Sequence, residues 1–449
     1  MGGEMGKYVY MVYRTLSYGL SPFLYLHVQC RRLQGLEHPL RWQERFGRPS
    51  LPRPPGPLLW FHAVSLGEGM AAIPIIKHCI QQRPDLTILM TTTTTSAFNV
   101  IKDRLPLGVI YQFAPLDTPS AMDAFLGYWD PSAIFLIESE LWPNLVLGAS
   151  RKGIVVALLN ARMSSKSFKL WSAPVALPLI SLMLSRFSLI APISTIEAIQ
   201  YQLLQARPFT INFAGDLKYA VGNAEASEQE CTIMEDLQLQ LANRPVWMAA
   251  SIHKGEEEVM LGAHKVLVKM YSNMLTIIVP RHPWEGRQIV IEVQKEGLNV
   301  VLRSSGEKIL ASTNIYVVDT LGELSFLYKL APIAVIGGSF LPGLAGHNIS
   351  EAAAAGCAVL TGHHVGHFSH MVLEMQRSNP LSVMKVSGKL ELVEALKELF
   401  SNAELLEARR MAAKQSFFAL SSGIITNIWN LIDLHVLRKA FLAKDVVVK

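Results

Sequence analysis

Short apolar segments alternate with amphipathic helices twice along the chain, and this alternation constrains the fold more than any other feature of the sequence. The predicted strands of the first series are Leu58–Val64, Thr87–Met90, Val109–Gln112, Ala133–Ile137, Val155–Asn160 and Leu189–Pro192. Those of the second series are Val246–Ala250, Leu275–Val279, Val300–Arg303, Ile315–Val318, Ile333–Ile336 and Ala358–Leu360. Strict alternation of strand and helix predicts parallel sheets that helices cover on both faces.

The length of 449 residues favours two domains, because single hydrophobic cores stop growing near ~250–300 residues. A polar, acidic region separates the two series, and the pattern after Leu390 is helical. We therefore predict an α/β protein with two tandem Rossmann-like, doubly wound domains and a cleft between them. The predicted parts are an N-terminal segment with a basic cluster (1–50), a first domain (51–221), a linker (222–240), a second domain (241–420) and a C-terminal helix (421–449).

Composition and charge narrow the classes of function. Half of the residues are apolar, 17% are charged and the net charge is +5, which is typical of a globular protein with large cores. The mild positive charge suits an anionic substrate or a membrane surface. No long Lys/Arg run or aromatic and basic platform is present, which argues against a nucleic-acid partner. The four cysteines lack C-x-x-C spacing, so we predict a reducing compartment.

The N-terminal segment is apolar from Tyr8 to Val28, but Arg14 interrupts it. The uncharged stretch from Thr15 to Cys30 is shorter than the ~20 residues that a spanning helix needs. We therefore expect an interfacial anchor or a core helix. A basic cluster follows, which suits anionic lipid headgroups or forms a solvated face; it consists of Arg31, Arg32, Arg41, Arg45 and Arg48.

A glycine-containing turn joins the first strand to its helix in the segment Leu58–Ala72, which formally matches the dinucleotide fingerprint G-x-G-x-x-A. That fingerprint requires an acidic residue ~20 positions later to bind the ribose. Thr91 to Thr95 occupy that place, and Glu68 lies where a pyrophosphate would pass. A nicotinamide-dependent oxidoreductase is therefore disfavoured, and Glu68 becomes a candidate general base at a strand–helix junction.

A second glycine loop lies in Pro342–Leu360, between the predicted strand Ile333–Ile336 and an alanine-rich helix that Gly356 ends. A strand, a glycine loop and a helix N-terminus together favour anion or ribose binding. Asn348 and Glu351 also fit the spacing of a capping box, which would need no ligand. The spacing alone leaves both interpretations open.

Several motifs, taken in order, resemble those of the Kdo (3-deoxy-D-manno-oct-2-ulosonic acid) transferases, and the deviations fit the plant-type branch of that family. The resemblance runs from residue 41 to near the C-terminus, and ESELWPN with PRHP is its most specific part. The motifs are Arg41–Gly47 (RWQERFG), Val64–Glu68 (VSLGE), Glu138–Asn144 (ESELWPN), Asn160–Arg162 (NAR), Gly215–Lys218 (GDLK), Pro280–Pro283 (PRHP), Leu321–Leu324 (LGEL) and His347–Glu351 (HNISE).

The resemblance implies a GT-B glycosyltransferase that moves Kdo from CMP-Kdo to a hydroxyl of an anionic lipid A precursor, with inversion and without a metal or other cofactor. The first domain would bind the acceptor and the second the CMP-sugar. Glu68 would be the catalytic base, and Glu138 and Lys218 would stabilise the transition state. The implied CMP-binding residues are Pro280, Arg281, Leu321, Gly322, Glu323, Asn348, Ile349, Ser350 and Glu351.

Each of these residues also has a structural interpretation. Glu138 and Glu140 could be a strand-end pair, and Lys218 a surface charge near the linker. The acidic run that begins at Glu256 fits the first turn of a helix, where carboxylates complement the dipole. A non-catalytic nucleotide-binding protein derived from the same fold is the alternative function.

The histidines at 363, 364, 367 and 370 invite a metal site, since His363 and His367 are spaced as on one helix face. No Cys, Asp or Glu joins them, so we predict no metal site.

In the corresponding loop of the family, His363 replaces a usual proline and His367 a usual asparagine. We therefore expect a mitochondrial, membrane-associated enzyme that meets the membrane through its N-terminal segment, with a bacterial inner membrane as the alternative.

Overall fold

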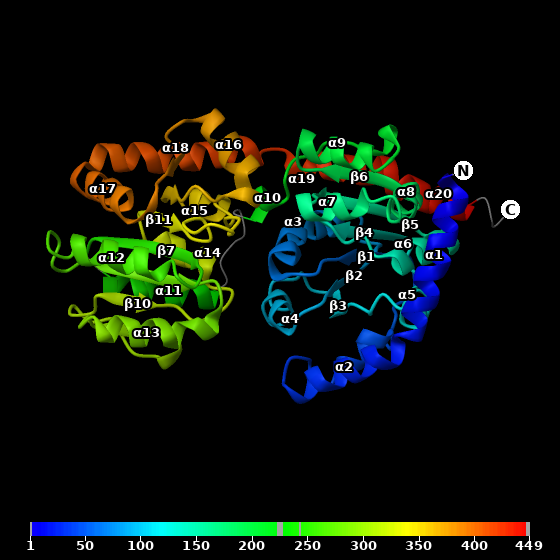
Figure 1. The fold of residues 1–449 in the computed structure, drawn as a ribbon, viewed down its shortest axis with the longest axis horizontal. Coiled ribbons are helices and arrows are strands. Elements are labelled where there is room, and N and C mark those ends of the chain that lie inside the picture. The colour runs from blue at the N-terminus through cyan, green and yellow to red at the C-terminus, as the bar shows by residue number, and fades with distance from the viewer. Residues whose placement is uncertain (1, 222–227, 242–243, 446–449) are drawn as a thin grey trace. The chain divides into compact units, whose positions relative to one another are not determined.

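The structure is a computed structural model that describes residues 2–221, 228–241 and 244–445. It consists of two compact units, Met1–Ala220 with Gly423–Lys449, and Val221–Ser422 (Figure 1). Each predicted strand is present, and both sheets are parallel. The predicted α/β class with two Rossmann-like sheets is therefore confirmed.

The first unit contains a six-stranded sheet in the order β3-β2-β1-β4-β5-β6, which is the doubly wound order. All five residues of β1 and of β4 are buried, because helices cover both faces. The strands are β1 (Leu58–His62), β2 (Thr87–Thr92), β3 (Ile110–Phe113), β4 (Ala133–Ile137), β5 (Val155–Ala161) and β6 (Phe187–Pro192). The helices are α1 (Gly2–Gly19), α2 (Ser21–Leu33), η1 (Trp42–Phe46), α3 (Leu66–Gln82), α4 (Thr95–Ile101), α5 (Pro119–Trp129), α6 (Pro143–Arg151), α7 (Ser165–Trp171), α8 (Leu177–Leu184), α9 (Thr195–Leu203), η2 (Pro208–Thr210), α10 (Lys218–Val221), α19 (Ile424–Ile432), η7 (Asp433–Leu437) and α20 (Arg438–Asp445).

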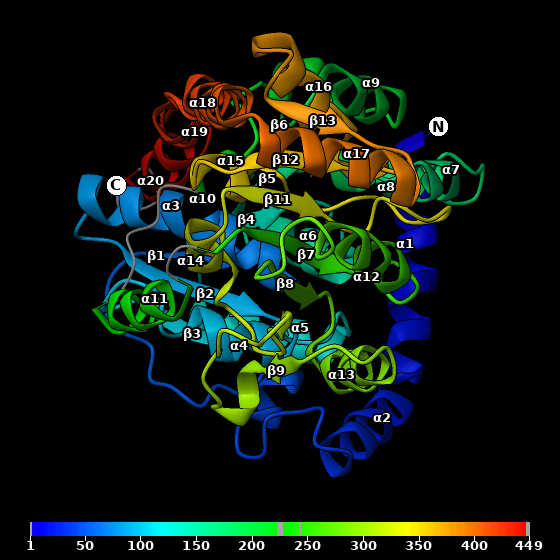
Figure 2. The same cartoon turned by 90° about the vertical axis from the view of Figure 1, so that its left-hand side faces the viewer.

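The second unit contains a seven-stranded sheet in the order β13-β12-β11-β7-β8-β10-β9. Helix α18 packs on β12 and also contacts α15 and α17 (Figure 2). The strands are β7 (Val246–Ile252), β8 (Leu275–Pro280), β9 (Val300–Leu302), β10 (Ile315–Val317), β11 (Ile333–Ile336), β12 (Ala358–Thr361) and β13 (Val383–Lys385). The helices are α11 (Glu228–Leu241), α12 (Glu257–Leu267), η3 (Pro283–Glu285), α13 (Gly286–Lys295), η4 (Arg303–Ser305), α14 (Leu324–Leu327), η5 (Tyr328–Leu330), α15 (Ser350–Ala354), η6 (Gly366–Phe368), α16 (Ser369–Ser378), α17 (Gly388–Ser401) and α18 (Ala403–Ser421).

Three local differences from the predicted pattern have simple causes. The edge strand β13 was missed, because three residues are too few to show a period. Most of the predicted linker forms α11, while its residues 222–227 lie outside the described part of the chain. The predicted C-terminal helix is divided into α19, the π-helical turn η7 and α20, which pack against α3 and β6 of the first unit.

The basic cluster after the N-terminal helices is largely used within the first unit. Buried Glu37 pairs with Arg31 at 2.7 Å and lies 3.7 Å from Arg45. Glu44 is fully buried, pairs with Arg41 at 2.8 Å and accepts the backbone N–H of Phe113. The RWQERFG motif therefore fastens the N-terminal segment to the β3 edge, and these arginines do not form a free basic face.

Asp117 joins helix α1 to helix α6. Its carboxylate accepts the backbone N–H groups of Asn144 and Leu145, at 3.1 and 2.9 Å, and the hydroxyl of Tyr13, at 3.0 Å. The first two donors are orphan groups of the α6 N-terminus. Burial raises the pKa of Asp117 to about 6.

Replacing Asp117 by alanine should therefore destabilise the fold. Asp117→Ala leaves three donors without their acceptor, so we expect the free energy of unfolding to fall by about 1–3 kcal/mol. Chemical denaturation would measure it. Asp123→Ala is the matched control, because that side chain is 46% exposed and its ion pair with Arg14 should contribute at most about 1 kcal/mol. Equal effects of the two variants would contradict the role of Asp117.

Candidate functional site

The predicted base Glu68 lies in the first turn of α3, just beyond the carboxyl end of β1. Its carboxylate accepts the backbone N–H of Val64 and the hydroxyl of Ser65, both at 2.8 Å. Ser65 is the N-cap of α3, and its hydroxyl oxygen accepts the Glu68 N–H at 3.4 Å, so the two residues fix the helix start together. The dinucleotide alternative fails here, because this carboxylate occupies the turn and Thr91 is buried against Trp60 and His62.

The basicity of Glu68 follows from two opposing effects. Burial raises its pKa, and the negative charge of Glu138 raises it further. The hydrogen bonds from Val64 and Ser65, together with the charge of Lys218, act in the opposite direction. Burial is the largest contribution, so the carboxylate is a stronger base than an exposed glutamate despite its place at a helix start.

Glu138 and Lys218 form a buried ion pair next to Glu68. Glu138 Oε1 contacts Lys218 Nζ, and Glu138 Oε2 lies 3.9 Å from Arg162. Both paired side chains are only 11% exposed, so Lys218 is not a surface charge. The Lys218 turn is itself fixed, because Asn160 Oδ1 accepts the Leu217 N–H and Asp216 accepts the Lys218 N–H. The structure thus brings the three predicted catalytic residues together.

β1 and β4 are adjacent in the sheet. From β1 the chain builds the sheet outward to β3, and it then returns to the other side of β1 with β4. The carboxyl ends of β1 and β4 are therefore the topological switch point, where doubly wound sheets bind ligands. Glu140 lies in the loop between β4 and α6 and belongs to the same cluster, since the charges of Glu68 and Glu138 both act on it. The indole of Trp142 hydrogen-bonds to Glu140 and packs 4.7 Å from the ring of His62. The sequence motif ESELWPN contained this residue, but only its position in the fold reveals the third carboxylate.

In the second unit, Glu256 joins the loops after β7 and β11. This carboxylate is fully buried and accepts four backbone N–H groups, from His253, Gly338, Ser339 and Phe340, at 2.7 to 2.9 Å. β7 and β11 are neighbours at the switch point of this sheet. Glu256 is therefore more than a first-turn acid that complements a helix dipole; it holds the strand-end loops in place.

The predicted CMP-binding residues lie in three loops at the carboxyl edge of the second sheet. Pro280 ends β8, and exposed Arg281 donates its N–H to Ile252. Gly322 adopts φ +84°, and neighbouring Glu323 is bound by Arg303 at 2.9 Å. Leu321 is exposed, whereas Ile349 and Ser350 are buried. No structural finding tests ligand binding by this set, which stays a prediction.

The helix start at Asn348 differs from a capping box. The N-cap position of α15 is Ile349, and the Asn348 side-chain oxygen accepts the N–H and the hydroxyl of Ser350. Asn348 Nδ2 donates to Glu351 at 3.3 Å. The capping-box interpretation is therefore wrong here.

Four aromatic side chains from separate loops of the second unit form two stacked pairs that the sequence did not predict. His253 Nε2 and His347 Nε2 are 2.8 Å apart and their rings stack, while His282 stacks on Trp284 at 4.4 Å. Burial lowers the pKa of His347 to about 3, so it remains neutral.

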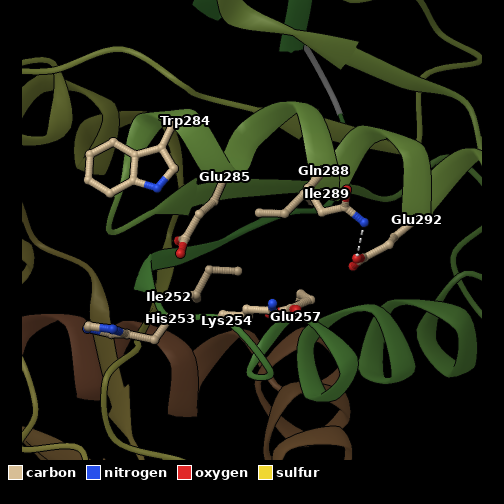
Figure 3. A pocket seen from close by; sticks show the side chains of 9 residues that line it. All are labelled: Ile252, His253, Lys254, Glu257, Trp284, Glu285, Gln288, Ile289 and Glu292. Carbon is tan, nitrogen blue, oxygen red and sulfur yellow. Dashed lines mark hydrogen bonds between the residues drawn. The ribbon is translucent and has the colours of Figure 1, made fainter. Parts of the chain in front are cut away.

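Beside these pairs, a cavity of about 280 Å³ lies between the start of α12 and the face of α13 (Figure 3). Trp284, Glu285 and Glu292 line it from the α13 side, His253 from the loop after β7, and Glu257 from the start of α12.

Metal-binding residues do not converge within the described ranges. No group of three His, Cys, Asp or Glu side chains there could hold a metal ion. His363 is exposed, and the side chain of His367 lies outside the described part.

Comparison with known proteins establishes the family. Residues 40–221 match the family described as 3-deoxy-D-manno-octulosonic-acid transferase (kdotransferase). An Arabidopsis thaliana protein, named probable 3-deoxy-D-manno-octulosonic acid transferase, mitochondrial, is 61% identical over 97% of this chain and 98% of its own length. This chain belongs to the Kdo transferase family. The 3-deoxy-D-manno-octulosonic acid transferase of Haemophilus influenzae is 30% identical over 88% of this chain and 90% of its own length, and the higher identity to the Arabidopsis protein fits the plant-type branch.

Solved structures agree on the fold of this Kdo transferase. A glycosyltransferase from Rickettsia africae matches with a TM-score of 0.56 and 12% identity, over 84% of this chain and 98% of that one. The UDP-GlcNAc 2-epimerase of Neisseria meningitidis bound to UDP-GlcNAc matches with a TM-score of 0.58 and 13% identity, over 84% and 100%. The fold is GT-B, as predicted.

The Glu256 cross-link should be important for the stability of the second unit. Glu256→Gln replaces one accepting oxygen by an amide that faces backbone N–H donors, so we expect a loss of about 1–3 kcal/mol for each orphaned donor. Glu258→Gln removes the same charge from an exposed neighbouring position and should change stability by less than about 0.5 kcal/mol. Chemical denaturation of both variants would measure the difference, and similar midpoints would refute the cross-link.

Proposed function

We propose that this protein transfers Kdo from CMP-Kdo to a hydroxyl of a lipid A precursor, with inversion at the anomeric carbon and without a metal ion. Family membership supports the transferase activity. The support for the mechanism is the cluster of Glu68, Glu138 and Lys218 at the switch point of the first sheet. A non-catalytic nucleotide-binding protein would not need a buried base beside a buried cation.

Glu68 is suited to accept the proton of the acceptor hydroxyl. A sugar alcohol is a poor nucleophile near neutral pH, and a positioned carboxylate assists by removing its proton as the new C–O bond forms. Attack from the face opposite the leaving group inverts the anomeric carbon, and the electron pair of the broken bond leaves with CMP. The raised pKa of Glu68 favours this proton transfer.

Fixed cations can stabilise the negative charge that develops on the departing phosphate. Lys218 is held by Glu138 and by its anchored turn, so it can act without reorganisation. In the second unit, Arg281 is exposed at the end of β8, where it can bind the donor's phosphate or carboxylate. The backbone N–H groups near Gly322 and Asn348 would add further donors. These residues supply a physical basis for transfer in the absence of a divalent ion.

The N-terminal helices supply a surface for contact with a lipid bilayer. α1 packs on α8 and α5 (Figure 1). Both α1 and α2 carry large exposed apolar side chains. These include Tyr8, Met11, Leu16, Tyr18, Phe23 and Leu26. A helix with such a face lies in the interface of a membrane. We infer a membrane-associated enzyme in the mitochondrion, as the name of the Arabidopsis relative suggests.

A second apolar segment exists at the other end of the chain. By length and composition, residues 403–441 could cross a membrane, and 22% of its most apolar window is buried. This is weak support, since α18 packs on the second sheet and α19 on α3. We therefore place the membrane contact at the N-terminal helices.

Replacing Glu68 tests the mechanism. Glu68→Gln keeps the shape of the side chain but cannot accept a proton, so kcat should fall by about 10²–10⁴-fold. The assay supplies CMP-Kdo and a tetraacylated lipid A precursor with EDTA present, and follows transferred Kdo. Wild-type activity should survive EDTA.

Glu197→Gln is the matched control, because Glu197 receives the hydroxyl of Ser194 at the start of α9 as Glu68 receives that of Ser65. This control should remain active. Full activity of Glu68→Gln would exclude Glu68 as the base, and absence of transfer by the wild type would exclude the proposed reaction.

Membrane contact can be tested with charge on the apolar face. Phe23 and Leu26 are 69% and 60% exposed, so Phe23→Glu with Leu26→Glu should leave the fold intact and reduce co-sedimentation with anionic vesicles at least about tenfold. Leu239→Glu, at a side chain 78% exposed on α11, should bind vesicles like the wild type. Equal binding by all three proteins would place the membrane contact elsewhere.

A further inference from the structure

The carboxyl group of Glu140 has no assigned role, although it lies beside the proposed base. It belongs to the loop between β4 and α6, which is fixed at both ends. The Glu138 N–H donates to Leu159 O at 2.9 Å, and the α6 N–H groups of Asn144 and Leu145 are held by Asp117. The Leu141 N–H also donates to Ser139 O at 2.8 Å. Glu140 is therefore presented to the cluster by a rigid loop.

The three carboxyl groups have different kinds of contact. Glu138 pairs with two cations: one of its oxygens contacts Lys218, and the other lies 3.9 Å from Arg162. Glu68 is bound by two hydrogen-bond donors of its own turn. Glu140 receives the neutral indole of Trp142 and faces the negative charges of Glu68 and Glu138. Its ionised form is therefore the least stabilised of the three.

Proton sharing between close carboxyl groups follows from this arrangement. Like charges in a partly buried site cannot all remain ionised, so one group retains a proton. Burial, followed by the charge of Glu68, raises the pKa of Glu140 to about 8. His62, which packs on Trp142, does not supply a compensating charge, because burial lowers its pKa to about 3. The proton of the cluster thus belongs on Glu140, which leaves Glu68 anionic.

We propose that Glu140 works as a neutral carboxylic acid, a positioning residue that leaves Glu68 ionised and keeps the cluster from repelling an anionic substrate. This inference rests on the proposed transfer reaction. Its proton is not consumed: the acceptor's proton goes to Glu68, and the electron pair of the broken bond leaves with CMP. When Glu140 ionises, the added charge beside Glu68 and Glu138 opposes binding of the phosphate and carboxylate groups of the substrates.

The pH profile of transfer tests this role. For the wild type, kcat/KM should fall about tenfold per pH unit above pH about 8, mainly through KM, because the protonated fraction of Glu140 falls by that factor. Glu140→Gln mimics the neutral acid. The kcat/KM of this variant should be a few-fold lower than that of the wild type at pH 7. It should not decline at alkaline pH, so at pH 9 it should be higher than that of the wild type. Glu140→Asp keeps a titrating carboxyl and should keep the decline.

A matched control and a second measurement separate this inference from the transfer reaction itself. Asp85→Asn removes an exposed carboxylate before β2, at the opposite edge of the sheet, and should leave the wild-type profile unchanged. In protein labelled with ¹³C at glutamate carboxyl carbons, one resonance should titrate near pH 8 and be missing from Glu140→Gln.

An alkaline decline in Glu140→Gln like that of the wild type, or no resonance titrating near pH 8, would overturn the proposal. If the wild type transfers no Kdo, the proposed function falls, while the resonance still decides whether Glu140 holds a proton.

Discussion

The left-handed turn of the backbone at the ends of buried strands is the constraint on which the sites depend. Glu138, Asn160 and Ser251 have φ of +64°, +55° and +57°, and they lie at the carboxyl ends of β4, β5 and β7. A residue other than glycine in this conformation costs on the order of 1 kcal/mol or more. At Glu138, the ion pair with Lys218 and the bond to Leu159 hold the turn. Strain at the strand end thereby keeps the carboxylate beside Glu68.

The switch points of the two sheets differ in how their buried carboxylates are stabilised. In the first unit, Glu138 pairs with the cations of Lys218 and Arg162, and the carboxyl groups of Glu68 and Glu140 lie in the field of its charge. In the second unit, one carboxylate, Glu256, saturates four backbone N–H groups that converge from two loops. A converging set of N–H groups attracts an anion. Here the Glu256 carboxylate is that anion. Since it already accepts these four N–H groups, a ligand of this unit would have to bind donors in the neighbouring loops.

Local pattern was sufficient to predict the architecture, because buried parallel strands and amphipathic helices have distinct periods. The ordered motifs also identified the family and brought Glu68, Glu138 and Lys218 to attention together. Pairings between distant segments could not be predicted in this way. The sequence pattern of the arginines at 31, 41 and 45 fits either a lipid-binding face or a solvated face, yet they pair with the buried side chains of Glu37 and Glu44. The spacing of Asn348 and Glu351 fits a capping box, whereas the N-cap position of α15 is Ile349, since spacing does not reveal where a helix begins.

The return of the chain from the second unit to the first has a consequence for biosynthesis. The first unit contains residues from both ends of the chain, and Ile424 of α19 packs so closely on Gly215 that an added Cβ would lie 2.9 Å from it. Gly215 begins the turn that carries Lys218. On the ribosome, β1 to β6 emerge long before α19, so this turn gains its packing partner only after the whole second unit has been synthesised. During synthesis, the turn that carries Lys218 therefore lacks this packing partner until α19 has emerged.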